Sequence, residues 1–103
     1  MINISLRQLE YFVAAAQHGG AARAAHALSV SQPSISKAIA DLESLWNEVL
    51  FVRRHARGLD LTAAGRQRQR EAQALLEKAR ALEGPRREEE AGLLRVGCLT
   101  TLA

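Results

Sequence analysis

Apolar residues recur at helical spacing from the start of the chain. The first stripe comprises Leu6, Leu9, Phe12, Val13 and Ala16, and this periodicity predicts an amphipathic helix. Ser5 and Gln8 have the spacing of a capping box, in which the hydroxyl and the amide each bond to the other residue's backbone. Gly19 and Gly20 follow the stripe, and we expect the helix to end there because glycine adopts the left-handed conformation without steric cost.

Two shorter helices are predicted next. The first, from Ala21 to about Leu28, has small apolar residues on its expected buried side: Ala24, Ala25 and Leu28. Ser29 and Val30 form a turn, and Ser31 caps a third helix with Pro33 in its first turn. On that third helix the core side is Ile35, Ile39, Leu42 and Trp46, and the opposite side is Pro33, Ser36, Lys37, Ala40 and Ser44.

A hairpin and a long helix complete the predicted elements. Residues 49–53 and 59–61 read as short strands joined by 55–58, whose glycine supplies the positive φ of a tight turn. Thr62 caps a fourth helix that runs to about Glu83. Its stripe repeats at spacings of three, four and three, which is typical of a coiled-coil seam: Ala72, Leu75, Ala79 and Leu82. Packing of this stripe within its own domain is the alternative, and pairing is favoured because nothing else in the chain is left to cover it.

The end of the chain changes character at Gly84 and Pro85, which break the fourth helix. Residues 86–90 are charged, and residues 93–99 read as an apolar strand without a partner strand, as at the start of a further domain. We therefore expect three parts: a domain at 1–61, a linker or dimerisation helix and hinge at 62–90, and the start of a further, missing domain at 91–103.

Composition limits the setting in which this chain works. With 103 residues and 48% apolar content it can form one small domain. Cys98 is the only cysteine, which fits a reducing compartment, and no signal peptide or membrane-spanning apolar run is present, so we expect a cytoplasmic protein. The three histidines and Cys98 lack metal-ligand spacing, so neither a metal nor another cofactor is expected.

Charge is more informative in its placement than in its sum, which is +3. Residues 1–61 are nearly neutral, yet Arg53, Arg54 and Arg57 sit together with no acid between Glu48 and Asp60. Such a cluster on a neutral domain favours contacts with phosphate over a merely solvated hairpin. On the fourth helix, Arg66, Arg68 and Arg70 are expected to form a solvated face that could also meet the distal part of a nucleic-acid partner.

Together these elements predict a mainly α fold: a winged helix-turn-helix of three helices and a two-stranded wing, followed by a long dimerisation helix. The major groove of B-DNA is about 12 Å wide and admits one α-helix when the side chains facing it are short. Serine, alanine and proline meet that requirement on the third helix, whereas Gln32 and Lys37 are long enough to reach base edges or phosphates.

From Leu6 to Leu61 the sequence resembles the LysR-type transcriptional regulators. The resemblance rests on Leu6-Arg-Gln-Leu9, Tyr11-Phe12-Val13, Arg23-Ala-Ala25, Val30-Ser-Gln-Pro-Ser-Ile-Ser36, Leu42-Glu43, Leu50-Phe51, Arg53 and Leu61-Thr62-Ala-Ala-Gly65. Residues 62–83 look like that family's linker helix, through which subunits pair. Arg95-Val96-Gly97 looks like the first strand of its effector-binding domain, where a small-molecule effector would bind.

The resemblance implies a regulator that binds promoter DNA as a dimer or higher oligomer. By the same resemblance the groove-facing or base-reading positions are Gln32, Pro33, Ser36 and Lys37, the backbone contacts are Ser31 and Ser34, and the wing residue is Arg53. Charge adds Arg54 and Arg57, and Arg23 can reach phosphate from the second helix.

The sequence departs from the family pattern at two places. Trp46-Asn47 stands where the family usually has Leu-Gly, so the hairpin is expected to sit at an altered angle. Gly20-Ala-Ala22 replaces a serine cap and a bulky apolar residue, so we expect a less stable second helix.

Two other classes of function are alternatives to DNA binding. A protein-interaction module, including a dominant-negative one that pairs with a full-length relative, would keep its function when Arg53, Arg54 and Arg57 are reversed to Glu. An enzyme is not expected, because the sequence has no acid pair, nucleophile arrangement or phosphate-binding glycine loop in a suitable context.

Overall fold

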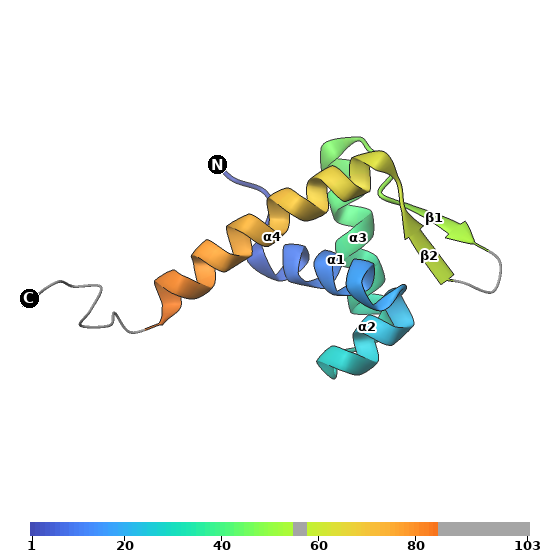
Figure 1. Ribbon diagram of the computed structural model, residues 1–103, viewed down its shortest axis with the longest axis horizontal. Helices are drawn as coiled ribbons and strands as arrows, with labels where there is room; N and C mark the ends of the chain where they lie inside the picture. The colour runs from blue at the N-terminus through green and yellow to red at the C-terminus, as the bar shows by residue number, and fades with distance from the viewer. Residues whose placement is uncertain (55–57, 85–103) are drawn as a thin grey trace, which may run out of the picture.

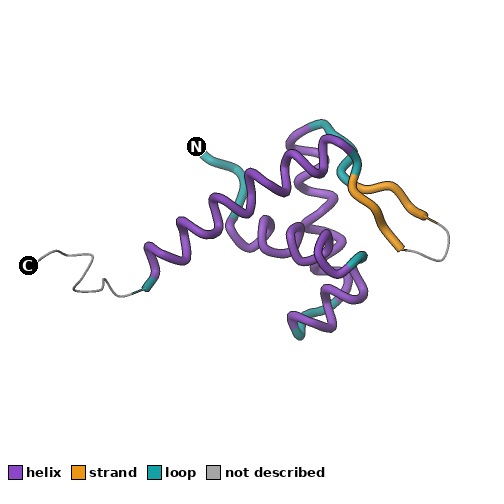
Figure 2. The backbone as a smooth tube through the Cα atoms, viewed as in Figure 1, coloured by secondary structure: helices purple, strands orange, loops and turns teal. Residues whose placement is uncertain are grey.

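The computed structural model describes residues 1–54 and 58–84 of the chain. Its elements follow the predicted order (Figures 1 and 2): α1 (Leu6–His18), α2 (Ala21–Leu28), α3 (Gln32–Trp46), β1 (Phe51–Arg54), β2 (Gly58–Leu61) and α4 (Ala63–Glu83). The two strands pair antiparallel, with Phe51 opposite Leu61 and Arg54 opposite Gly58. The predicted fold class, a winged helix-turn-helix with a long following helix, is confirmed.

Most helix ends form as the sequence predicts. The Ser5 hydroxyl accepts from the Gln8 amide at 3.1 Å, and the Gln8 side chain accepts from the Ser5 amide at 2.9 Å. Gly19 and Asn47 end α1 and α3 in the left-handed conformation. At the start of α2, Gly20 provides no side-chain hydrogen bond, which leaves this end with fewer satisfied amide groups than the others.

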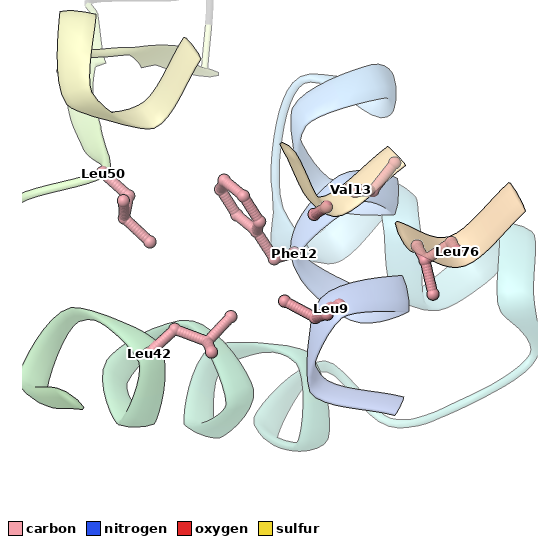
Figure 3. Close-up of a cluster of buried hydrophobic side chains, with 7 residues drawn as sticks. Leu9, Phe12, Val13, Leu42, Leu50 and Leu76 are labelled. Carbon is pink, nitrogen blue, oxygen red and sulfur yellow. The ribbon is translucent and has the colours of Figure 1, made fainter. Parts of the chain in front are cut away.

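The core is built around α1. Its buried face meets α3, the α3–β1 loop and α4 in one cluster (Figure 3): Leu9, Phe12, Val13, Leu42, Leu50, Ala72 and Leu76. Phe12 is fully buried and makes edge-to-face contacts with Trp46 at 6.2 Å and Phe51 at 5.7 Å between ring centroids. A second cluster joins α1 to α2 and α3 through small residues: Ala14, Ala15, Ala24, Ala25, Ile35 and Ile39.

The predicted buried faces are wrong at two leucines. Leu28 is exposed, because it is the last residue of α2 and the chain turns away at the left-handed Ser29. Leu6 is exposed because it is the first residue of α1 and lies beyond the packed part of the helix. The remaining core residues predicted for α1, α2 and α3 are buried or half-buried as expected.

The predicted seam on α4 is wrong at Ala72. This residue is 4% exposed and packs in the α1 core together with Leu76, which the seam did not include. The expectation that nothing in the chain covers α4 is therefore incorrect, since α1 covers one side of it. Leu75 and Leu82 lie on another side and are 44% and 87% exposed, while Ala79 is half-buried, so dimerisation through these three residues stays a prediction.

The start of α4 is bound to the loop that precedes β1. The Thr62 hydroxyl donates to the Val49 carbonyl at 2.6 Å, and the Thr62 amide donates to the Leu50 carbonyl at 2.9 Å. The same hydroxyl caps α4 by accepting from the Gly65 amide. Gly65 packs so closely here that an added Cβ would lie 2.2 Å from the Leu50 carbonyl oxygen.

Several predicted features lie outside the described residues. These are the loop at 55–57 with Arg57, the hinge residues 85–90, and the domain start at 91–103 with Cys98. None of the helices within residues 1–54 and 58–84 is both long and apolar enough to cross a membrane.

Replacing Gly65 with Ala tests the packing at the start of α4. We expect Gly65→Ala to lower the free energy of unfolding by about 1–3 kcal/mol, because the methyl group would collide with backbone rather than with a flexible side chain. Thermal denaturation measures the effect, at about 4–8 °C per kcal/mol for a domain of this size. Gly20→Ser is the control: a Cβ there meets nothing within 4 Å, and its stability should be unchanged or slightly raised.

Candidate nucleic-acid interface

The outer face of α3 is exposed along its length. Ile35, Ile39 and Leu42 anchor the opposite face in the core, which fixes the rotation of the helix about its axis. The outward residues predicted from the sequence are all exposed: Pro33, Ser36, Lys37, Ala40 and Ser44. Apart from Lys37 these side chains are short, so the backbone of α3 can approach a partner closely.

The first turn of α3 is organised by two serines. The Ser31 hydroxyl accepts from the Ser34 amide at 3.2 Å and lies 2.7 Å from the Ser34 hydroxyl. Both residues are exposed, as are Gln32 and Pro33 beside them. The capping role predicted for Ser31 is confirmed, and the exposed first turn presents the positive end of the helix dipole to solvent.

Lys37 has a partner that the sequence analysis missed. Its ammonium group lies 3.0 Å from Asp41 Oδ2, one turn further along α3. The Lys37 side chain is 77% exposed, and such surface pairs contribute at most a few tenths of a kcal/mol, so the ammonium can leave this contact for a stronger anion. The (i, i+4) spacing was the available signal, because opposite charges at that spacing meet on a helix.

A cleft of about 270 Å³ brings together candidate residues from three elements. Arg23 of α2, Gln32 of α3 and Arg53 of β1 all line it, although they are far apart in the sequence. Arg23 and Arg53 are exposed, so the cleft opens beside the first turn of α3 with two guanidinium groups on its lining. This arrangement suits an anion such as a phosphodiester, which arginine can bind through paired N–H groups.

The wing is fixed to the rest of the domain near this cleft. The Leu59 amide of β2 donates to the Gly19 carbonyl at 3.1 Å. Gly58 makes this approach possible, since a Cβ on it would lie 2.5 Å from the Gly19 oxygen. Gly58 also has a φ of +84°, which confirms the positive φ predicted there. The position of β1, and of Arg53 on it, therefore depends on the α1–α2 turn.

Two arginines of the wing and one arginine of α4 differ in what the structure describes of them. Arg57 lies outside the described residues, and for Arg54 the structure describes only its place in β1. Arg68 was expected to belong to a solvated face of α4, and this is wrong: it is bonded to Glu48 and stacked on Trp46. No pattern of spacing could have shown this, because Glu48 and Trp46 belong to a different part of the chain.

Arg7 is a further exposed cation that the sequence analysis did not single out. It lines a cavity of about 220 Å³ between α1 and α3, together with Ser34, Lys37 and Asp41. Its position in the first turn of α1 places it beside the outward face of α3. Among the described residues, no three His, Cys, Asp or Glu side chains gather in a way that could hold a metal ion.

Comparison with known proteins gives a consistent result. Residues 6–66 match the family described as "Bacterial regulatory helix-turn-helix protein, lysR family". The chain is 45% identical over 76 residues to the HTH-type transcriptional regulator TcbR of Pseudomonas sp. (strain P51), covering 74% of this chain and 26% of that protein. It is 40% identical over 102 residues to the HTH-type transcriptional regulator ClcR of Pseudomonas putida, covering 96% of this chain and 34% of that protein. The chain thus spans about a quarter to a third of the length of these curated relatives.

Solved structures also resemble this fold. A crystal structure of a CbnR_DBD-DNA complex matches with a TM-score of 0.71 and 43% identity, covering 77% of this chain and 90% of that one. A BenM_DBD/catB site 1 DNA complex matches with a TM-score of 0.70 and 30% identity, covering 77% of this chain and 84% of that one. Nearly the whole of each of these two chains is therefore represented here.

Two glycine substitutions separate the effects of backbone strain and of steric contact on the wing. Gly19 and Gly58 both have a positive φ, but a Cβ on Gly19 meets only a flexible arginine tip at 4.0 Å. Gly19→Ala should lower the free energy of unfolding by about 1–2 kcal/mol through backbone strain alone. Gly58→Ala should lower the free energy of unfolding by more than Gly19→Ala does. It should also speed hydrogen exchange at the Leu59 amide, because the wing must move off the Gly19 carbonyl. Equal losses of stability and an unchanged Leu59 exchange rate would contradict a wing fixed at this contact.

Proposed function

This chain belongs to the lysR family of bacterial regulatory helix-turn-helix proteins, and from that premise we propose that it is a sequence-specific transcriptional regulator. In this proposal it binds promoter DNA with α3 in the major groove and acts in the bacterial cytoplasm. The relatives it matches are named as transcriptional regulators, and we propose regulation rather than catalysis as the role of this chain.

The observation that carries the proposal is the pairing of a thin outer face on α3 with flanking cations. Ser36 and Ala40 allow the helix to lie close to base edges, and Arg23 and Arg53 border its first turn. A helix that displays short side chains between positive groups matches a groove between two phosphate backbones. We therefore assign the outer face of α3 to the groove.

Individual roles follow from side-chain length and position. Gln32 and Lys37 can reach base edges, where glutamine pairs with adenine and lysine with guanine. Arg23 and Arg53 would bind phosphates and so set the position of the domain on the duplex. We assign Ser31, Pro33, Ser34 and Ser36 to groove or backbone contacts, and Arg54 and Arg57 to the backbone beside the wing.

We propose that the chain pairs through α4. Leu75 and Leu82 are exposed apolar residues two turns apart on a helix, and Ala79 lies between them. Pairing α4 with the same helix of a second copy would bury both leucines and place one recognition helix in each half-site. In the same proposal residues 1–61 bind DNA, residues 62–90 pair and form a hinge, and residues 91–103 begin a domain in which a small-molecule effector would bind.

Substitutions at the proposed base-reading residues and at the proposed phosphate-binding residues test the assigned roles. Gln32→Ala and Lys37→Ala should each reduce the preference for the selected sequence by about 1–3 kcal/mol at one base position. Arg23→Ala and Arg53→Ala should instead weaken binding to all sequences. Each should also make the slope of log affinity against log salt concentration shallower by about one. Binding to arrayed duplexes at several salt concentrations measures both effects, and Lys78→Ala on the exposed side of α4 is the control.

Flat binding across the array would remove sequence-specific regulation as the function. If reversal of Arg53, Arg54 and Arg57 to Glu left the cellular function unchanged, a protein-interaction module would be the better description.

Introducing charge on the exposed leucines of α4 tests the pairing. Leu75→Glu with Leu82→Glu should raise the dimer dissociation constant at least about tenfold, because two apolar side chains per subunit lose their burial. Ala74→Glu with Ala81→Glu adds the same charge at exposed positions on other sides of α4 and should have little effect. Analytical ultracentrifugation distinguishes the two pairs, and an equal effect of both would refute the assignment of Leu75 and Leu82 to the interface.

A further inference from the structure

Trp46 and Arg68 join the recognition helix to the long helix. Trp46 is the last residue of α3, and the Arg68 guanidinium carbon of α4 lies 4.4 Å from the centroid of its ring. Phe12 meets the same ring edge to face at an angle of 73°, so the indole is fixed from the core side. A cation over a tryptophan face is attracted by the negative face of the ring.

Two carboxylates orient the Arg68 guanidinium in this contact. Arg68 Nε donates to Glu48 Oε1 at 2.8 Å, and Arg68 Nη1 lies 3.6 Å from Glu71 Oε1. Glu48 belongs to the loop after α3, whereas Glu71 is on α4, so the guanidinium is held from both sides of the junction. The Arg68 and Glu48 side chains are each about one-third exposed, which places the pair at the flank of α4 rather than beneath it.

The buried surface beneath α4 contacts the 49–50 loop at its start and α1 further along. Its buried residues are Gly65, Ala72 and Leu76, and two of these have small side chains or none. The side chains that interlock at a helix contact set the angle between the two helix axes. A further contact at the flank, between Gly65 and Ala72 in the sequence, therefore contributes to the tilt of α4.

We propose that Trp46 and Arg68 are positioning residues that set the angle between α4 and the recognition helix, and through it the distance between the two half-sites that a dimer binds. This inference rests on the proposed function, since it needs DNA binding by paired chains. Neither residue has to touch DNA to have this effect.

Helix α4 is long enough for a small change in its angle to displace its far end appreciably. Figure 1 shows α4 starting beside the C-terminal end of α3, running across α1 and then projecting beyond the other elements. From Arg68 to Glu83 the helix spans about 22 Å at 1.5 Å per residue. A tilt of about 9° at the Trp46 end would move the far end by about 3.4 Å, which is the rise of one base pair. Small changes at the pair thus alter which half-site spacing fits.

The test uses duplexes that carry two copies of the half-site selected by the wild-type chain, separated by spacers that differ by single base pairs. The wild type should prefer one spacer length. Arg68→Gln and Trp46→Leu should each reduce that preference about three- to tenfold, the range expected for loss of a partly desolvated cation–π contact. Affinity for a single half-site should not change, and Trp46→Tyr, which keeps an aromatic face, should retain most of the preference.

Arg70→Gln is the matched control, because it removes the same charge from an exposed position on α4 that bonds to Gln67. Trp46 is the only tryptophan, so its fluorescence reports independently whether the contact is lost in Arg68→Gln. If the fluorescence emission changes while the preferred spacer length and the strength of that preference stay as in the wild type, the inference is wrong and the proposed function stands. If the wild type shows no sequence-specific binding, the proposed function fails and this inference fails with it.

Discussion

The structure depends on burial of the apolar stripe of α1. Helices α2, α3 and α4 all pack on this one helix, and Phe12 at its centre is fully buried against Trp46 and Phe51. Burying a phenylalanine contributes about 1.5–3 kcal/mol, whereas a surface ion pair such as Lys37–Asp41 contributes at most a few tenths. The fold is therefore held by α1, and a weakly paired surface residue such as Lys37 remains available for other contacts.

This arrangement makes the placement of the interface indirect. The outward face of α3 is defined by which of its residues α1 buries, and the wing is defined by where its backbone meets the α1–α2 turn. Arg23, Gln32 and Arg53 line one cleft because α2, α3 and β1 are each fixed by neighbours other than the cleft itself. Such a site needs no internal packing, and its side chains stay exposed for a partner.

Close backbone approaches explain why certain residues are small. Gly65 lies against the Leu50 carbonyl, Gly58 against the Gly19 carbonyl, and Ala72 against the core of α1. Each of these contacts brings an element that comes later in the sequence against one that comes earlier. The contact of Arg68 with Trp46 at the flank adds to these buried contacts of α4, and we propose that it sets the final tilt of the helix.

By itself the sequence determined the helices, the order of the elements and the outward face of α3, because caps, periodicity and turn glycines are local properties that Ser5, Ser31, Thr62 and Gly58 display within a few residues. Tertiary structure alone decided that Ala72 faces α1 rather than a partner, that Arg68 stacks on Trp46, and that Arg23 and Arg53 share a cleft. These facts depend on which surfaces meet after the chain folds back on itself. Spacing along one element carries no information about an opposing element more than a few turns away in sequence.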